Sequence, residues 1–239
     1  MEFKVATFDC YGTLIDWEGG AASFLYEMAR RHEPDPPPSH ELRARWEELQ
    51  FERLQGPYMG YREVLADSLA EWAGERGYRW NDRDGEALAR SMESWQPFPD
   101  TVPALRAAKE AGMRLWIISN TDRAIIEHSL RHLEVEFDGV TVAEDCRAYK
   151  PADAPFEHAL SQIDTDRSEI LHVAFGFKYD LAAAQRHGLR TAWVNRHRAP
   201  APGPERPDHE WSDLWPLAEL ASAGGGPAGG AGDAAERPH

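Results

Sequence analysis

The stretch "FDCYGTLID" (residues 8–16) places one carboxylate, Asp9, directly after a short apolar run that is typical of a buried strand. A carboxylate at the end of a strand can ligate a metal ion, attack a substrate as a nucleophile, or simply start a turn, as Asp commonly does. Which of these roles Asp9 has depends on the side chains that the rest of the chain brings beside it.

Short strand-like runs alternate with amphipathic helical segments along much of the chain. This alternation predicts an α/β fold, a Rossmann-like parallel sheet with helices on both faces. Strands are predicted over residues 3–10, 114–120, 139–145, 170–177 and 190–196, and helices over 102–112, 122–133, 153–163 and 180–188. Ligands of such sheets bind beyond the carboxyl ends of the strands. The polar residues that follow these ends should therefore gather at one edge: Asp9, Ser119, Asn120, Lys150 and Asp180.

The alternation is interrupted between residues 17 and 97, where three helical stretches are predicted at 39–55, 60–75 and 84–95. We interpret residues 17–97 as an all-helical cap domain inserted into a core domain made of residues 1–16 and 98–222. Residues 223–239 are rich in Gly, Ala and Pro without apolar periodicity, which predicts a disordered tail.

The charge balance excludes some classes of partner. The chain has 26 Lys and Arg against 41 Asp and Glu, a formal net charge of -15. Such a charge disfavours nucleic acid and anionic membranes as partners. The chain shows no signal-peptide pattern and no membrane-spanning run, and its two cysteines lie far apart, so we expect a cytoplasmic protein. A small anionic substrate would need concentrated positive potential at its site.

Four motifs resemble, in order and spacing, those of the haloacid dehalogenase superfamily. They are "DCYGTL" (9–14), "ISNTD" (118–122), "YKP" (149–151) and "YDLAAA" (179–184). Phosphatases of this superfamily resemble D-x-D at the first motif and carry two acids at the last. Here Tyr11 replaces the second Asp, and Lys178 lies in a last motif that has one acid, Asp180. Since Mg²⁺ prefers carboxylate ligands, we expect no metal and no other cofactor.

The sequence is therefore similar to the type II branch, the (S)-2-haloacid dehalogenases, whose first motif resembles D-x-Y-G-T. The resemblance implies that Asp9 displaces halide from an (S)-2-haloacid and forms an ester, which water hydrolyses to the (R)-2-hydroxy acid. It also makes a homodimer plausible. Two alternatives stay open: a small-molecule phosphatase with an atypical Mg²⁺ site, and a binding protein whose catalysis has weakened.

By the same resemblance, four residues are catalytic. Asp9 is the nucleophile, Lys150 balances its charge, Asp180 orients Lys150 and activates water, and Thr13 lies beside them. In the cap, "RARWEELQF" (43–51) resembles the helix that carries the halide-binding Arg and places it at Arg45. The complete substrate-binding set is Cys10, Tyr11, Arg45, Trp46, Leu49, Tyr61, Ser119, Asn120, Phe175, Phe177 and Tyr179.

Three positions depart from the pattern of this branch. Phe156 stands where a Tyr is common, and Phe175 and Phe177 stand where Ser and Asn are common. Polar groups near the water site are thus replaced by aromatic ones, which we expect to alter the substrate class or to slow ester hydrolysis. The ten histidines show no metal-ligand spacing, and His172 and His187 are expected to face solvent or a packed helix.

Overall fold

One parallel sheet forms the centre of the computed structural model, which describes residues 3–224. Its six strands follow the order β3-β2-β1-β4-β5-β6. They are β1 (Val5–Phe8), β2 (Arg114–Ser119), β3 (Gly139–Val142), β4 (Ile170–Ala174), β5 (Arg190–Val194) and β6 (His209–Trp211). Five of the six strands were predicted, although each is shorter than its apolar run. The short β6 was not predicted, because three residues carry too little periodicity.

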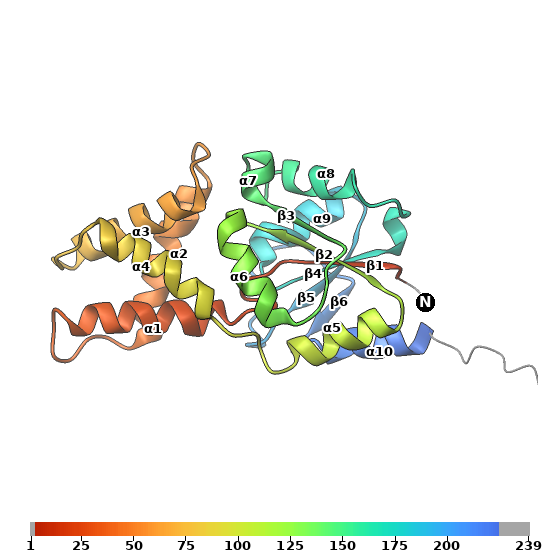
Figure 1. Cartoon of the computed structure of the whole chain (residues 1–239), viewed down its shortest axis with the longest axis horizontal. Helices are drawn as coiled ribbons and strands as arrows, with labels where there is room; N and C mark the ends of the chain where they lie inside the picture. The colour runs from red at the N-terminus through yellow and green to blue at the C-terminus, as the bar shows by residue number, and fades with distance from the viewer. Residues whose placement is uncertain (1–2, 225–239) are drawn as a thin grey trace, which may run out of the picture.

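Helices cover both faces of the sheet. Successive side chains of β2 alternate between two apolar cores, with Leu115 and Ile117 in one and Trp116 and Ile118 in the other. Figure 1 shows α5 and α10 below the sheet and α8 above it. The predicted Rossmann-like fold class is thereby confirmed. The helices of this part are α5 (Thr101–Glu110), α6 (Arg123–Leu133), α7 (Ala143–Cys146), α8 (Ala154–Leu160), α9 (Ala182–Arg186) and α10 (Trp215–Gly224).

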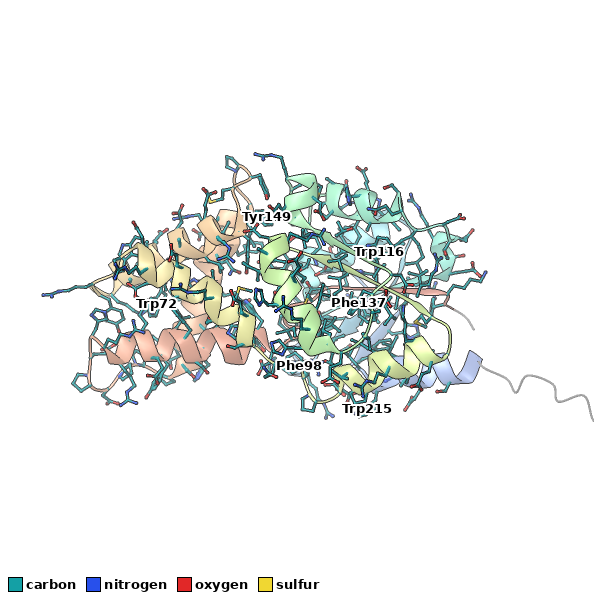
Figure 2. All side chains as sticks on the ribbon, viewed as in Figure 1. Trp72, Phe98, Trp116, Phe137, Tyr149 and Trp215 are labelled. Carbon is teal, nitrogen blue, oxygen red and sulfur yellow. The ribbon has the colours of Figure 1, made fainter. Side chains whose placement is uncertain are left out.

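A second group of helices lies beyond the carboxyl end of β1 (Figure 1). It consists of α1 (Trp17–Arg30), α2 (Ser39–Leu54), α3 (Tyr61–Glu75), α4 (Asp82–Ser91) and a 3₁₀ turn, Met92–Ser94. Trp72 is fully buried within this group, whereas Trp116 is buried against the sheet (Figure 2). Each part therefore has a large aromatic side chain in its interior. The exact division of the chain into a core domain and a cap domain stays a prediction.

Helix α1 was not predicted, because Gly19 and Gly20 weaken the helical pattern at its start. The structure shows what stands beside each glycine, and a Cβ added at Gly19 would lie too close to the Asp16 carboxylate. The Asp16 side chain accepts a hydrogen bond of 2.9 Å from the Gly19 N–H and so caps the helix. A Cβ added at Gly20 would lie 2.5 Å from the Trp95 ring, so close packing of the turn against this ring favours glycine there.

Several predicted boundaries differ from the structure, and the strand expected over 139–145 ends at Val142, where helix α7 begins. The strand expected over 170–177 ends at Ala174 and is followed by a π-helical turn, Phe177–Leu181. Helix α10 continues to Gly224, so residues 223 and 224, assigned to a disordered tail, are helical; the rest of that tail lies outside the described residues. Within residues 3–224, no helix is both long and apolar enough to cross a membrane. The cytoplasmic location and the homodimer stay predictions.

Candidate active site

The ammonium of Lys150 bridges two carboxylates at the carboxyl edge of the sheet. Lys150 Nζ lies 3.0 Å from Asp9 Oδ1 and 2.6 Å from Asp180 Oδ1. It also donates to the Ile118 carbonyl at 2.7 Å, so all three ammonium protons have acceptors. Lys150 and Asp180 are each 1% exposed, and Asp9 is 8% exposed. The structure thus brings the three charged residues of the predicted catalytic set into one buried cluster.

Three different elements place these groups. Asp9 follows β1, Asp180 lies in the π-helical turn after β4, and Lys150 lies in the loop between α7 and α8. The Asn120 side chain holds this loop, since its Nδ2 donates to the Lys150 carbonyl at 3.0 Å and its Oδ1 accepts from the Lys150 N–H at 2.7 Å. Asn120 thus holds the Lys150 backbone and also lines the cavity, and its predicted contact with the substrate carboxylate stays a prediction.

Thr13 connects the nucleophile to the end of β4. Its hydroxyl donates to Asp9 Oδ2 at 2.8 Å and accepts from the Phe175 N–H at 2.8 Å. Gly12, the residue before Thr13, has a φ of +91°. A Cβ added at Gly12 would lie 2.7 Å from the Phe175 ring. The glycine of the first motif is thus required both by its backbone conformation and by the close approach of this aromatic ring.

The cluster has two carboxylates and one ammonium, so negative charge is in excess when both carboxylates are ionised. Burial raises the pKa of Asp9, and Asp180 adds to this effect, while Lys150 and Thr13 oppose it. Burial alone would raise the pKa of Asp180 too, but Lys150 and His172 outweigh it and hold that pKa below its usual range. Burial disfavours the Lys150 ammonium, yet the two carboxylates raise the pKa of Lys150 overall. Asp180 is the better stabilised anion, which agrees with its shorter contact to Lys150.

A small cavity of about 80 Å³ opens in front of this cluster. A single water needs roughly 10–15 Å³ by this measure, so the cavity suits a molecule of several heavy atoms. Its lining is Asp9, Tyr11, Trp17, Glu47, Gln50, Leu54, Tyr61, Ser119, Asn120, Lys150, Phe175, Gly176, Tyr179 and Asp180. Five of these fourteen residues are aromatic, and Ser119 Oγ is buried without a hydrogen-bond partner within residues 3–224.

Arg45 lies elsewhere than predicted. Its guanidinium is hydrogen-bonded to Glu75 on α3 at 3.0 and 2.5 Å and to Glu48 at 2.8 Å, on the exposed side of α2. In an α-helix, Arg45 stands about 200° around the axis from Glu47, which does line the cavity. The halide-binding assignment of Arg45 is therefore corrected to a surface ion-pair residue.

Four other predicted substrate-binding residues do not line the cavity. Trp46 is fully buried, stacks on Trp17 with ring centroids 5.8 Å apart and donates to Ser68. The remaining three are likewise packed inside the protein. Cys10 and Leu49 are 0% exposed, and Phe177 packs with Leu181 and Trp193 because β4 ends before it. Their side chains shape the surroundings of the cavity without facing it.

The cavity also contains residues that were not predicted. Glu47, Gln50 and Leu54 lie at positions i, i+3 and i+7 of α2, which is one face of a helix. Trp17 and Gly176 complete the unpredicted set. The resemblance of residues 43–51 to the halide-binding helix of the family, matched through Leu49 and Phe51, instead predicted that Arg45 points inward, and the structure places Glu47 there.

Glu47 places a carboxylate on the side of the cavity that α2 forms. Its carboxylate is paired with Arg43 at 2.5 Å, and Arg43 also contacts Glu18 at 2.8 Å. Burial raises the pKa of Glu47 above its ordinary value, against the opposing charge of Arg43. Within residues 3–224, Lys150 is the only cation that lines the cavity.

The donor set does not suit a Mg²⁺ ion, which superfamily phosphatases use. Only two carboxylates stand at the cluster, and Lys150 Nζ takes one oxygen of each, Asp9 Oδ1 and Asp180 Oδ1. Within the described residues, no three His, Cys, Asp or Glu side chains form a group that could hold a metal ion.

Tyr149 joins the two parts of the molecule near the cavity. It lies at the boundary between them in Figure 2, and its hydroxyl donates to the Met59 carbonyl at 2.8 Å. The Asp122 carboxylate accepts from the Tyr61 and Arg62 N–H groups at 2.9 and 3.0 Å and so binds the start of α3. These contacts fix Tyr61 and the start of α3 beside the carboxylate cluster.

Comparison with known proteins agrees with this geometry. Residues 3–188 match the family of haloacid dehalogenase-like hydrolases. Haloacetate dehalogenase H-2 of Moraxella sp. (strain B) is 27% identical over 204 residues, which cover 82% of this chain and 87% of that protein. The (S)-2-haloacid dehalogenase of Pseudomonas sp. (strain YL) is 28% identical over 200 residues, covering 81% of this chain and 83% of that protein.

Solved structures share the fold. An L-2-haloacid dehalogenase, RSc1362, is similar with a TM-score of 0.82 at 24% identity, covering 93% of this chain and 100% of that chain. The L-2-haloacid dehalogenase of Xanthobacter autotrophicus, solved with chloropropionic acid covalently bound, has a TM-score of 0.78 at 22% identity, with 92% and 98% covered. Since the family match spans most of the described chain, this protein belongs to the haloacid dehalogenase-like hydrolases, the superfamily that its four motifs predict.

Proposed function

We propose that this protein hydrolyses the carbon–halogen bond of (S)-2-haloacids to give (R)-2-hydroxy acids, without a metal ion. The observation that carries the proposal is the Asp9 carboxylate, held by Lys150 at 3.0 Å and Thr13 at 2.8 Å in front of a cavity of about 80 Å³. Curated relatives named as haloacetate and (S)-2-haloacid dehalogenases, at 27% and 28% identity, support the same class of reaction.

In the first step, an oxygen of Asp9 attacks the carbon that bears the halogen, from the side opposite to it. The new C–O bond forms as the carbon–halogen bond breaks, and the halide leaves with the bonding electron pair. This attack inverts the carbon and makes an ester. Halide is a stable anion, so no general acid is required, and Tyr11, with its hydroxyl bonded to Ser129 at 2.8 Å, serves as wall.

In the second step, water adds to the carboxyl carbon of the Asp9 ester and transfers a proton to Asp180. The bond between that carbon and the hydroxy-acid oxygen breaks, and the proton returns from Asp180 to this oxygen. Asp9 is left as a carboxylic acid that carries the second proton of the water, and release of this proton to solvent regenerates the carboxylate. The carbon inverted in the first step is not attacked again, so the product is the (R) form. Lys150 stabilises the negative charge that develops on the ester oxygen.

Binding of the substrate follows from the polar groups that face the cavity. The buried Ser119 hydroxyl is available to donate to the substrate carboxylate. On the α2 side, Gln50 Nε2 donates to the Tyr61 hydroxyl at 3.1 Å and keeps a second proton for the departing halide. With Arg45 on the surface, the halide is received by neutral donors rather than by a guanidinium.

Halide release from (S)- and (R)-2-chloropropionate in EDTA tests the proposal, with p-nitrophenyl phosphate and Mg²⁺ measured in parallel. We expect halide from the (S) form alone and no phosphate release. Phosphate release that requires Mg²⁺, without halide release, would show that the protein is a phosphatase. A covalent adduct without multiple turnover would instead indicate a binding protein that has lost ester hydrolysis.

A further inference from the structure

A buried histidine contacts the carboxylate that activates water. His172, in β4, is 1% exposed, and its Nε2 lies 3.1 Å from Asp180 Oδ1. Its other ring nitrogen, Nδ1, lies 2.9 Å from the Thr7 hydroxyl. Of the two expected surroundings of His172, solvent is wrong and a packed helix is confirmed, since its ring packs against Phe156 of α8; the hydrogen bond to Asp180 was not predicted.

The neighbouring strand β1 and helix α8 fix the imidazole from two sides. Thr7 stands directly opposite His172 in the parallel register of β1 and β4, so the two side chains share one face of the sheet. The Phe156 ring packs edge-on against the imidazole, with centroids 5.1 Å apart at 70°. The imidazole ring therefore cannot flip, which would exchange the partners of Nδ1 and Nε2, without moving the side chains packed against it.

The hydrogen-bond inventory shows which nitrogen carries a proton toward Asp180. An ionised carboxylate only accepts, so His172 Nε2 must donate to Asp180 Oδ1. The same oxygen accepts from Lys150 Nζ at 2.6 Å, and this oxygen is thereby fully occupied. The hydrogen bond from His172 also helps to hold the pKa of Asp180 below its usual range.

The other carboxylate oxygen of Asp180 has no such partner. Asp180 Oδ2 is buried and has no hydrogen-bond partner within residues 3–224, and Asp180 lines the cavity. A Cβ added at Gly176 would lie 2.5 Å from this oxygen, so the glycine leaves room at its side. Fixing Oδ1 through two donors therefore directs Oδ2 toward the space in which a hydrolytic water would stand.

We propose that His172 is a positioning residue for hydrolysis of the Asp9 ester: together with Lys150 it holds Asp180 Oδ1, so that Oδ2 receives the proton of the attacking water. The proposal rests on the ester mechanism proposed above. It also accounts for one of the three aromatic departures, since Phe156 supports the imidazole ring that orients Asp180. Ester formation at Asp9 does not depend on this contact.

The test compares His172→Leu with His172→Gln, separating the two chemical steps by rapid halide measurement and by mass spectrometry of the intact protein. His172→Leu keeps a similar volume but removes the donor. We expect the halide burst to stay within about 3-fold of wild type, while ester hydrolysis slows on the order of 10- to 100-fold and the adduct accumulates. His172→Gln keeps an amide donor and should recover much of the hydrolysis rate.

Ile170→Val is the matched control, because Ile170 lies on the same strand and the same face but does not contact Asp180. It should change neither step. Equal slowing of both steps in His172→Leu, or unchanged hydrolysis in a variant of wild-type melting temperature, would overturn the positioning role.

A spectroscopic measurement keeps this test independent of turnover. In ¹⁵N-labelled wild-type protein, the imidazole spectrum should show a proton on His172 Nε2, and Asp180→Asn should shift that signal. An unprotonated Nε2 would overturn the inference even in an active enzyme. Absence of halide release by the wild type, by contrast, would overturn the proposed function and leave the spectroscopic result to decide on the contact between His172 and Asp180.

Discussion

Lys150 Nζ lies 3.0 Å from Asp9 Oδ1, and this pair is buried beside a second carboxylate. Lys150→Met should therefore leave two buried anions without a cation, raise the pKa of Asp9 further and slow ester formation by at least about 100-fold. Loss of one partner from a buried ion pair costs about 3–5 kcal/mol, so the free energy of unfolding in urea should also fall.

Lys109→Met provides the control for Lys150→Met, because Lys109 pairs with Asp138 on the surface, with both side chains 32% exposed. Its effect on the free energy of unfolding should stay below about 1 kcal/mol. A Lys150→Met protein with wild-type burst kinetics would contradict the charge-balancing role.

Asp9→Asn should abolish turnover, because a neutral amide cannot displace halide. Isotope labelling of the wild type gives the sharper measurement. In a single turnover in H₂¹⁸O, the heavy oxygen should enter Asp9 and not the hydroxy acid, since water attacks the carboxyl carbon. Heavy oxygen in the first-turnover product would mean that water attacks the substrate directly.

The rate of ester formation should fall at acid pH, and the midpoint of this fall should lie above the ordinary Asp pKa of 3.8, because burial raises the pKa of Asp9. Only the ionised form attacks, so the burst rate is full at high pH and is lost as pH falls through the raised pKa. Thr13→Val removes the hydrogen bond that lowers this pKa and should move the midpoint to still higher pH. A midpoint at or below 3.8 would contradict the assignment.

Glu47→Gln should strengthen binding of anionic haloacids, because it removes a negative charge from the cavity wall. We expect KM for 2-chloropropionate to fall on the order of 3- to 10-fold with little change in kcat. Burial raises the pKa of Glu47, so the KM of the wild type should also fall as pH decreases and Glu47 is neutralised, whereas that of Glu47→Gln should not. Glu48→Gln, whose charge lies 66% exposed on the outer face of α2, should leave KM unchanged.

Gly12→Ala and Gly188→Ala form a matched pair for stability. Both glycines have positive φ, +91° and +75°, so each variant should lose about 1 kcal/mol or more from backbone strain. At Gly12 the new Cβ also meets the Phe175 ring at 2.7 Å, whereas Gly188 has open space. Thermal unfolding should therefore show a clearly larger loss for Gly12→Ala, and equal losses would contradict the close packing of Phe175.

Local signals in the sequence predicted five of the six strands, their alternation with helices and the gathering of Asp9, Lys150 and Asp180 at one edge of the sheet. Strand runs, helical periodicity and strand-end residues such as Asp9 and Asp180 are local signals, and the parallel α/β arrangement brings strand ends together whatever the details of packing. Helices α2, α3 and α4 of the helical group were also predicted, because a period of 3.6 residues is visible within a single segment.

Only the tertiary structure decided which groups face the cavity. Rotating α2 by about 200° exchanges Arg45 for Glu47, and no local property of the helix sets that rotation; the packing of Trp46 on Trp17 does. The contact between His172 and Asp180 likewise depends on a π-helical turn that brings the carboxylate back under β4. Helix phase and turn geometry are set by contacts between distant segments, and the free energy of those contacts exists only in the folded protein.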